Sequence, residues 1–158
     1  MSTTLKQTVT QPSSGNLIAA ASLNALANNA LVLGSAYNNN QAGAGAGFVR
    51  CLITLNYKFQ TAPGANTGLS LWLLRASDPT TDGSYEDGSS TLTPARIPDC
   101  VFPVGSSTDT NAHQIAREVR LPAGYFKPLL KNDGAGQSLT ANNTDNFLTL
   151  APITDQQV

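Results

Sequence analysis

The chain has 158 residues, a length that suits one domain with a single sizeable core. Nine basic and ten acidic side chains leave a formal net charge of -1, which excludes the strongly basic field that nucleic-acid binding requires. Only 12% of the residues are charged, so 14 Asn, 17 Thr, 13 Ser and 8 Gln must cover much of the surface, and such neutral side chains tolerate extensive contact with other protein chains.

The first sixteen residues, MSTTLKQTVTQPSSGN, predict an extended N-terminal arm. They carry a single charged side chain, Lys6, and end in a Pro-Ser-Ser-Gly-Asn sequence that interrupts regular structure. An extended arm can become ordered on a neighbouring chain, for example by adding a strand to the edge of a sheet. We therefore expect residues 1–16 to form an arm and residues 17–158 to form one domain.

Residues 17–37 give an ambiguous pattern. Their Ala and Leu content favours a helix, whereas the Asn residues and the flanking turn chemistry allow strands, and we expect strand-like or mixed structure. Asn24, Asn28 and Asn29 interrupt the apolar stretch, and amides are costly at bilayer depth. The segment is therefore expected to be neither a membrane span nor a signal peptide, in a soluble protein without an export signal.

The glycine tract that follows could in principle cradle a phosphate. Phosphate loops place their glycines between a strand and a helix, so that backbone N–H groups and the helix dipole face the anion. Here Gly43, Gly45 and Gly47 are spaced GxGxG rather than GxGxxG, and no Lys-Ser or Lys-Thr pair follows. The downstream segment alternates like a strand, so we expect a flexible loop or a strand entry.

Clear alternation begins in residues 48–59, which predict a strand with one buried face. The apolar face consists of Val49, Cys51, Ile53, Leu55, Tyr57 and Phe59. The next segment, LSLWLLRA at residues 69–76, is apolar on both faces. This pattern predicts a central strand that is covered on both sides.

Four further strands are expected beyond a long polar loop at residues 77–94. Prolines interrupt the first of them, RIPDCVFPV at residues 96–104, and such strands are confined to sheet edges. The others are residues 113–121, 124–131 and 146–153. Five or six strands separated by turn signals, without helical periodicity between them, indicate an all-β domain. We expect an antiparallel β-sandwich of jelly-roll-like architecture with an extended N-terminal arm.

No catalytic or metal-binding constellation is predicted. The one histidine, His113, begins a predicted strand and lies in no triad or zinc motif. Four acids, Asp78, Asp82, Glu86 and Asp87, crowd into the long loop and could surround a calcium ion, but their spacing does not match an EF-hand loop. We expect solvated turn carboxylates, no cofactor and no enzymatic activity, and leave ion binding by the loop at residues 78–87 open.

Two cysteines, Cys51 and Cys100, lie far apart in the sequence without a CxxC motif. They are expected to be buried free thiols rather than zinc ligands or a redox pair. The sequence Asn142-Asn143-Thr144 matches a glycosylation sequon, which has no meaning in a protein that is not secreted.

A carbohydrate-binding surface would need exposed aromatic rings on which sugars can stack. The candidates are Tyr37, Tyr57, Trp72, Tyr85 and Tyr125. The apolar neighbours of Trp72 favour a place in the core, and Tyr85 in the polar loop is the strongest candidate for an exposed ring. Carbohydrate binding is therefore an alternative hypothesis for this chain.

Five segments occur in a characteristic order: residues 23–34 (LNALANNALVLG), 48–59, 69–78 (LSLWLLRASD), 96–104 (RIPDCVFPV) and 121–137 (LPAGYFKPLLKNDGAGQ). In this order the chain resembles small structural proteins from the virion gene blocks of tailed bacteriophages, of the capsid decoration or cement type. The resemblance covers most of the chain after the arm. It implies a non-enzymatic β-sandwich whose function lies in its surfaces, so no catalytic residue is carried over.

The first hypothesis is therefore a phage decoration (cement) protein that binds the lattice of the major capsid protein and stabilises the head. It would form a symmetric homo-oligomer, a trimer or a dimer, on the outer surface of the virion after synthesis in the host cytoplasm. The alternatives are a structural protein of the tail or baseplate and a carbohydrate-binding adhesion module. Neither nucleic acid nor a membrane is an expected partner, and the arm at residues 1–16 is expected to reach the neighbouring chain.

Overall fold

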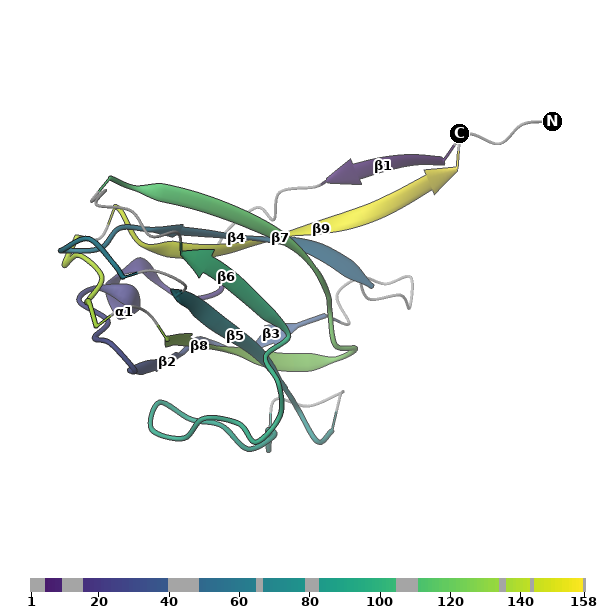
Figure 1. Cartoon of the computed structure of the whole chain (residues 1–158). Coiled ribbons are helices and arrows are strands. Elements are labelled where there is room, and N and C mark those ends of the chain that lie inside the picture. Colours follow the sequence, from purple (N-terminus) through teal and green to yellow (C-terminus); the bar gives the residue numbers. More distant parts are fainter. Residues whose placement is uncertain are drawn as a thin grey trace.

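The computed structural model describes residues 5–9, 16–39, 49–64, 67–78, 83–104, 111–133, 136–142 and 144–157. Within these residues the chain forms two antiparallel sheets that pack together, with one short helix beside them (Figure 1). The elements in chain order are β1 (Leu5–Val9), α1 (Ala20–Leu23), β2 (Leu31–Leu33), β3 (Tyr37–Asn38), β4 (Arg50–Tyr57), β5 (Thr67–Arg75), β6 (Cys100–Val104), β7 (His113–Arg120), β8 (Tyr125–Asn132) and β9 (Phe147–Gln157). The all-β prediction and the antiparallel β-sandwich are confirmed.

The strand order is that of a jelly roll. One sheet has the order β1-β9-β4-β7, and the other has the order β2-β8-β5-β6 with β3 also paired to β8. Strands β2 and β3 both pair with β8 and can be taken as one interrupted strand. The first strand then pairs with the last, and each following strand pairs with the one before that. The pairs are β1 with β9, β2 and β3 with β8, β4 with β7, and β5 with β6. Two further pairings, β4 with β9 and β5 with β8, roll this long hairpin into two sheets.

The main core lies between the sheets, and β4 supplies one wall of it. Alternate residues of β4 from Cys51 to Tyr57 are buried, as the sequence pattern predicts, and Phe59 beyond the strand is buried too. Val49 is the exception on this face, because β4 begins only at Arg50 and Val49 lies outside it, 63% exposed. Alternation therefore identified the buried face correctly, while the predicted segment extends two residues beyond β4 at each end.

Strand β5 is buried on both faces along residues 68–74, which confirms its predicted central position. Leu69, Leu71 and Leu73 face the main core. Trp72 and Leu74 face the other way and form a second apolar cluster with Leu129 of β8. The outer face of this sheet therefore also carries a covered apolar surface.

Strand β8 contains a proline although it lies inside the sheet, between β5 and the β2–β3 segment. The Pro128 carbonyl accepts a hydrogen bond from Gly34 N at 2.8 Å, so its missing N–H would face the same side, where the partner strand is interrupted between β2 and β3. Gly34 is required at this position, since a Cβ there would lie 2.4 Å from the Leu17 carbonyl oxygen and 2.6 Å from Pro128 Cγ. The missing N–H of Pro128 therefore costs the sheet little stability, because the partner strand is interrupted there.

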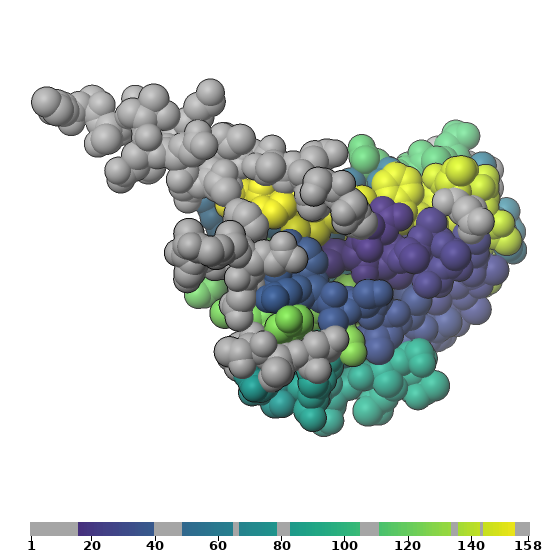
Figure 2. Space-filling view, turned by 180° about the vertical axis from the view of Figure 1, so that it is seen from behind, coloured from purple at the N-terminus to yellow at the C-terminus, as the bar shows by residue number. Residues whose placement is uncertain are grey.

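Residues 16–39 adopt mixed structure, as expected, and cross from one sheet to the other. Leu17 N donates a hydrogen bond to the Leu148 carbonyl of β9 at 2.7 Å, and β2 and β3 then pair with β8. Figure 2 shows these purple and blue residues between the yellow C-terminal strand and the teal residues at the bottom of the view. The buried amide of Asn132 secures the segment, because its Nδ2 donates to the carbonyl oxygens of Leu26 at 3.0 Å and Gln137 at 2.9 Å.

Strands β6 and β7 are edge strands, because each is the last strand of its sheet. The proline-interrupted segment is confirmed as an edge strand, although β6 begins at Cys100 rather than at the start of the predicted segment. Most side chains of β7 are exposed, and among the described strands this edge strand pairs with β4 alone. Beside this edge lies the pocket described below.

Candidate functional site

The N-terminal segment forms a ribbon with the end of β9. Strand β1 pairs with residues 153–157, and β4 pairs with β9 only as far as Ile153. Residues 154–157 therefore have β1 as their one strand partner among the described residues. Figure 1 shows this two-stranded ribbon projecting from the body of the sandwich. A ribbon of two strands is marginally stable by itself, and its edges present unpaired backbone groups that can template a further strand.

The loop between β5 and β6 covers the outer face of its sheet and is held there by Arg96. The guanidinium donates to Glu86 Oε2 from Nε at 3.2 Å and from Nη2 at 3.1 Å. It also donates to Asp99 Oδ2 at 2.9 Å and to the Leu73 carbonyl at 2.9 Å. Partial burial lowers the pKa of Arg96, but hydrogen bonds and attraction from Asp99 and Glu86 outweigh the burial and raise it above its usual value.

This arrangement also fixes the one tryptophan. Trp72 Nε1 donates to the Arg96 carbonyl at 3.0 Å, and the indole is only 4% exposed. Tyr85 packs on the same cluster, and Lys127 Nζ lies 4.2 Å from the centre of its ring. The loop therefore packs over an apolar surface of the sheet and is not a free polar segment.

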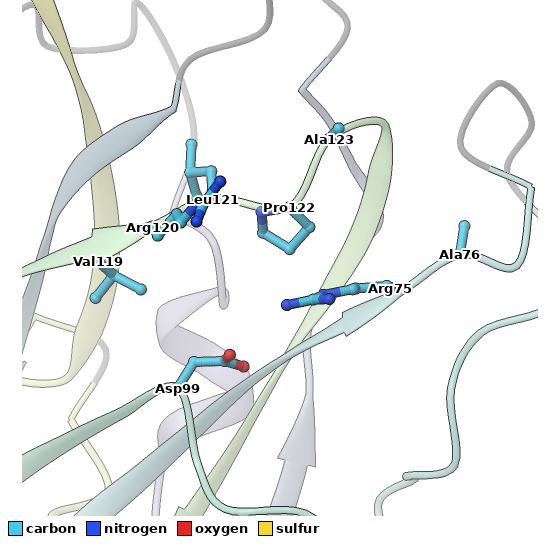
Figure 3. Close-up of a pocket in the computed structure, with 8 residues that line it drawn as sticks. All are labelled: Arg75, Ala76, Asp99, Val119, Arg120, Leu121, Pro122 and Ala123. Carbon is cyan, nitrogen blue, oxygen red and sulfur yellow. The ribbon is translucent and has the colours of Figure 1, made fainter.

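An open pocket of about 680 Å³ lies at one end of the sandwich, where β5 and β7 end and β6 begins. Its lining consists of Arg75, Ala76, Asp99, Val119, Arg120, Leu121, Pro122 and Ala123. Figure 3 shows Arg75 extending toward Asp99 and Pro122 from the end of β5, with Arg120 at the end of β7 and Leu121 just beyond it. Val119 and Leu121 are nearly buried, at 6% and 5% exposed, and give the pocket an apolar floor.

The charged side chains around this pocket differ in whether they have partners. Asp99 accepts hydrogen bonds from Arg96 and, at 2.7 Å, from Leu73 N, so its carboxylate is already engaged. Arg75 and Arg120 are exposed, and no ion pair joins either guanidinium to another described residue. The pocket therefore combines two available cations with apolar walls.

The acids in the described part of the long loop do not gather at one site. Glu86 is engaged by Arg96, Asp78 and Asp87 are exposed, and Asp82 lies outside the described residues. Among the described ranges, no group of three or more His, Cys, Asp or Glu side chains is placed to hold a metal. His113 stacks on Tyr57 with ring centres 5.6 Å apart and does not line the pocket.

None of the five candidate aromatic side chains is fully exposed. Trp72 and Tyr57 are buried, at 4% and 3% exposed, which confirms the expected core position of Trp72. Tyr37, Tyr85 and Tyr125 are half-buried. Tyr85, predicted as the most exposed ring, has one contact surface on the Trp72 cluster and Lys127 over its ring, so it offers no open platform for a sugar.

The two thiols are buried and free, as expected. Burial, with a smaller contribution from Cys100, raises the pKa of Cys51 to about 12. Burial also raises the pKa of Cys100 to about 11, against the opposing effect of Arg117. Both groups are therefore protonated at neutral pH, and neither is suited to act as a nucleophile or metal ligand. The glycine tract with Gly43, Gly45 and Gly47, and Asn143 of the sequon, lie outside the described residues.

The pocket arginines were missed at the sequence level. Arg75 and Arg120 lie far apart in the sequence and form no motif. The available signal was the position of Arg75 and Arg120 at the ends of two predicted strands, where side chains from different strands can converge. Sequence order alone did not indicate that these ends are neighbours.

The fold and its surfaces define the chain as a jelly-roll β-sandwich protein with a projecting ribbon and a basic pocket. Comparisons with protein-family models, with curated proteins and with solved structures found no match. Within the described residues, no helix has the length and apolar character needed to cross a membrane.

Proposed function

We propose that this protein is a decoration (cement) protein of a tailed bacteriophage, which binds the major capsid protein lattice and reinforces the head. The observation that carries the proposal is the ribbon of β1 and β9, which extends beyond the sandwich and presents strand edges to a neighbouring chain. The neutral polar composition supports the same function, because such a surface can be buried against protein at low desolvation cost.

The jelly-roll topology is compatible with this function and does not establish it. Jelly rolls occur in viral capsid proteins, but also in lectins and cupins, and a fold alone does not imply an activity. The order of sequence segments described above supports the phage assignment among these possibilities. Tyr85, the ring expected to be most exposed, packs on the Trp72 cluster beneath Lys127 and gives the lectin alternative no specific support.

The proposed mechanism is preferential binding to the assembled lattice. A ligand that binds only the assembled state stabilises it by RT ln(1 + [L]/Kd), about 2.7 kcal/mol for each site at a free concentration 100 times Kd. A symmetric oligomer, a dimer or trimer, would contact several lattice subunits at once and gain avidity from their fixed spacing. Many modest contacts then reinforce the whole shell.

Co-sedimentation with stripped, expanded capsids tests this proposal. We expect saturable binding with a fixed number of copies per capsid, and release of packaged DNA at a higher temperature once the sites are filled. Unassembled capsid protein is the control and should bind much more weakly. Absence of co-sedimentation, or binding without any gain in heat resistance, would contradict the cement function.

A further inference from the structure

We propose that the pocket formed by Arg75, Arg120 and the residues between β7 and β8 binds an acidic peptide segment, in which a carboxylate side chain stands next to an apolar one. This inference goes beyond the proposed capsid function and does not depend on it, since peptide binding is measured on the isolated protein. Three features of the pocket support it: the cations, the apolar floor and the charge already present.

The first of these features is the pair of arginine cations. The other ion pairs of the described residues already neutralise Arg50 with Glu118 at 2.6 Å, Lys58 with Asp145 at 3.8 Å and Lys131 with Asp133 at 2.6 Å. Arg75 and Arg120 have no such partner among the described residues, and both line this pocket. A guanidinium presents a planar fork of N–H donors that matches a carboxylate, so an exposed pair of them in one hollow favours an anionic ligand.

The second feature of the pocket is its apolar floor. Val119 and Leu121 pack against the main core and, like the buried Pro122, leave little surface exposed, so the half-buried Ala76 and the exposed Ala123 form the accessible part of an apolar wall beside the guanidinium groups. A small inorganic anion would leave this wall in contact with water. An apolar side chain adjacent to the carboxylate would cover it, at a gain of about 25 cal/mol for each Å² removed from water.

The third feature is the negative charge of Asp99, which favours a carboxylate ligand over a phosphate ligand. Asp99 lines the same pocket, and its charge is only partly offset by Arg96. A phosphate group carries up to two negative charges at neutral pH and would be repelled more strongly than a single carboxylate. The net charge of -1 on the chain likewise disfavours a polyanion.

Nuclear magnetic resonance titration of the ¹⁵N-labelled protein tests the proposal. The probe is N-acetyl-Glu-Leu-amide, and the neutral control is N-acetyl-Gln-Leu-amide. We expect saturable shifts of the backbone amides of residues 119–123 and of the Nε–H signals of Arg75 and Arg120 with the acidic peptide alone. The double variant Arg75→Gln and Arg120→Gln should weaken binding about tenfold or more, because it removes the charge-assisted hydrogen bonds.

Lys131→Gln is the matched control, since it removes one positive charge at the far end of β8 and should leave the titration unchanged. The dispersion of each spectrum shows directly whether the variants remain folded. Inorganic phosphate forms the third arm and should bind more weakly than the acidic peptide. Equal shifts with the neutral peptide, unchanged binding by the double variant, tighter binding of phosphate, or no shifts at all would overturn the proposal.

Discussion

Deletion of residues 1–16 is expected to abolish binding to capsids while the sandwich remains folded. The deletion removes β1, and with it the paired partner of residues 153–157. The described core residues begin at Leu17, and β9 keeps its pairing with β4 through residues 147–153. Co-sedimentation measures the binding, and far-ultraviolet circular dichroism with a thermal melt measures the fold.

A shorter deletion supplies the control for this experiment. Removal of residues 1–4 leaves β1 in place and should preserve capsid binding. Undiminished binding after removal of residues 1–16 would exclude the ribbon as the contact. A loss of folding in the longer deletion would instead show that β1 is part of the domain rather than an arm.

Replacement of Arg96 by Met is expected to release the loop between β5 and β6 from the outer face of its sheet. Methionine retains an apolar stem but donates no hydrogen bonds, so Glu86, Asp99 and the Leu73 carbonyl each lose the hydrogen bonds that they accept from the guanidinium. We expect a loss of about 2 kcal/mol in the free energy of unfolding, because charge-assisted hydrogen bonds are removed at a partly buried site.

The tryptophan makes this change directly observable. Trp72 is the one tryptophan of the chain and lies beneath the loop, so its fluorescence should shift to the red as water reaches the indole. Arg117→Met, at an exposed position on β7, is the control and should change stability by less than about 0.5 kcal/mol. An unchanged emission maximum and denaturation midpoint in Arg96→Met would contradict the clamping role of Arg96.

Hydrophobic patterning predicted the sandwich because its strands obey local rules. Cys51, Ile53 and Leu55 occupy alternate positions of β4 and are fully buried, and the double-sided apolar pattern of residues 69–74 identified the central strand. These predictions depend only on which face of a strand meets the core. They needed no knowledge of the strand partners.

The segments that were less predictable depend on pairing between distant residues. Pro128 lies inside a sheet, where a proline is normally disfavoured, and it is tolerated because the chain departs from its neighbour at Gly34. The arm was expected to be extended, but its pairing with residues 153–157 joins opposite ends of the sequence. Neither feature has a local signature.

The candidate site was largely invisible in the sequence for the same reason. Arg75, Asp99 and Arg120 come from three separated segments, and only the jelly-roll topology brings them to one pocket. The acids of the loop were expected to be solvated turn carboxylates, whereas Glu86 serves as the partner of an arginine ten positions away. Composition predicted a surface suited to protein contact without indicating where that contact lies.

Electron cryomicroscopy of stripped capsids mixed with the purified protein tests the central claim most directly. We expect ordered density on the outer surface at symmetry axes of the lattice, with the ribbon of β1 and β9 in contact with a strand edge of the major capsid protein. Density confined to the tail would assign the protein to the tail instead. Capsids that remain bare at saturating protein concentration would contradict the proposed function.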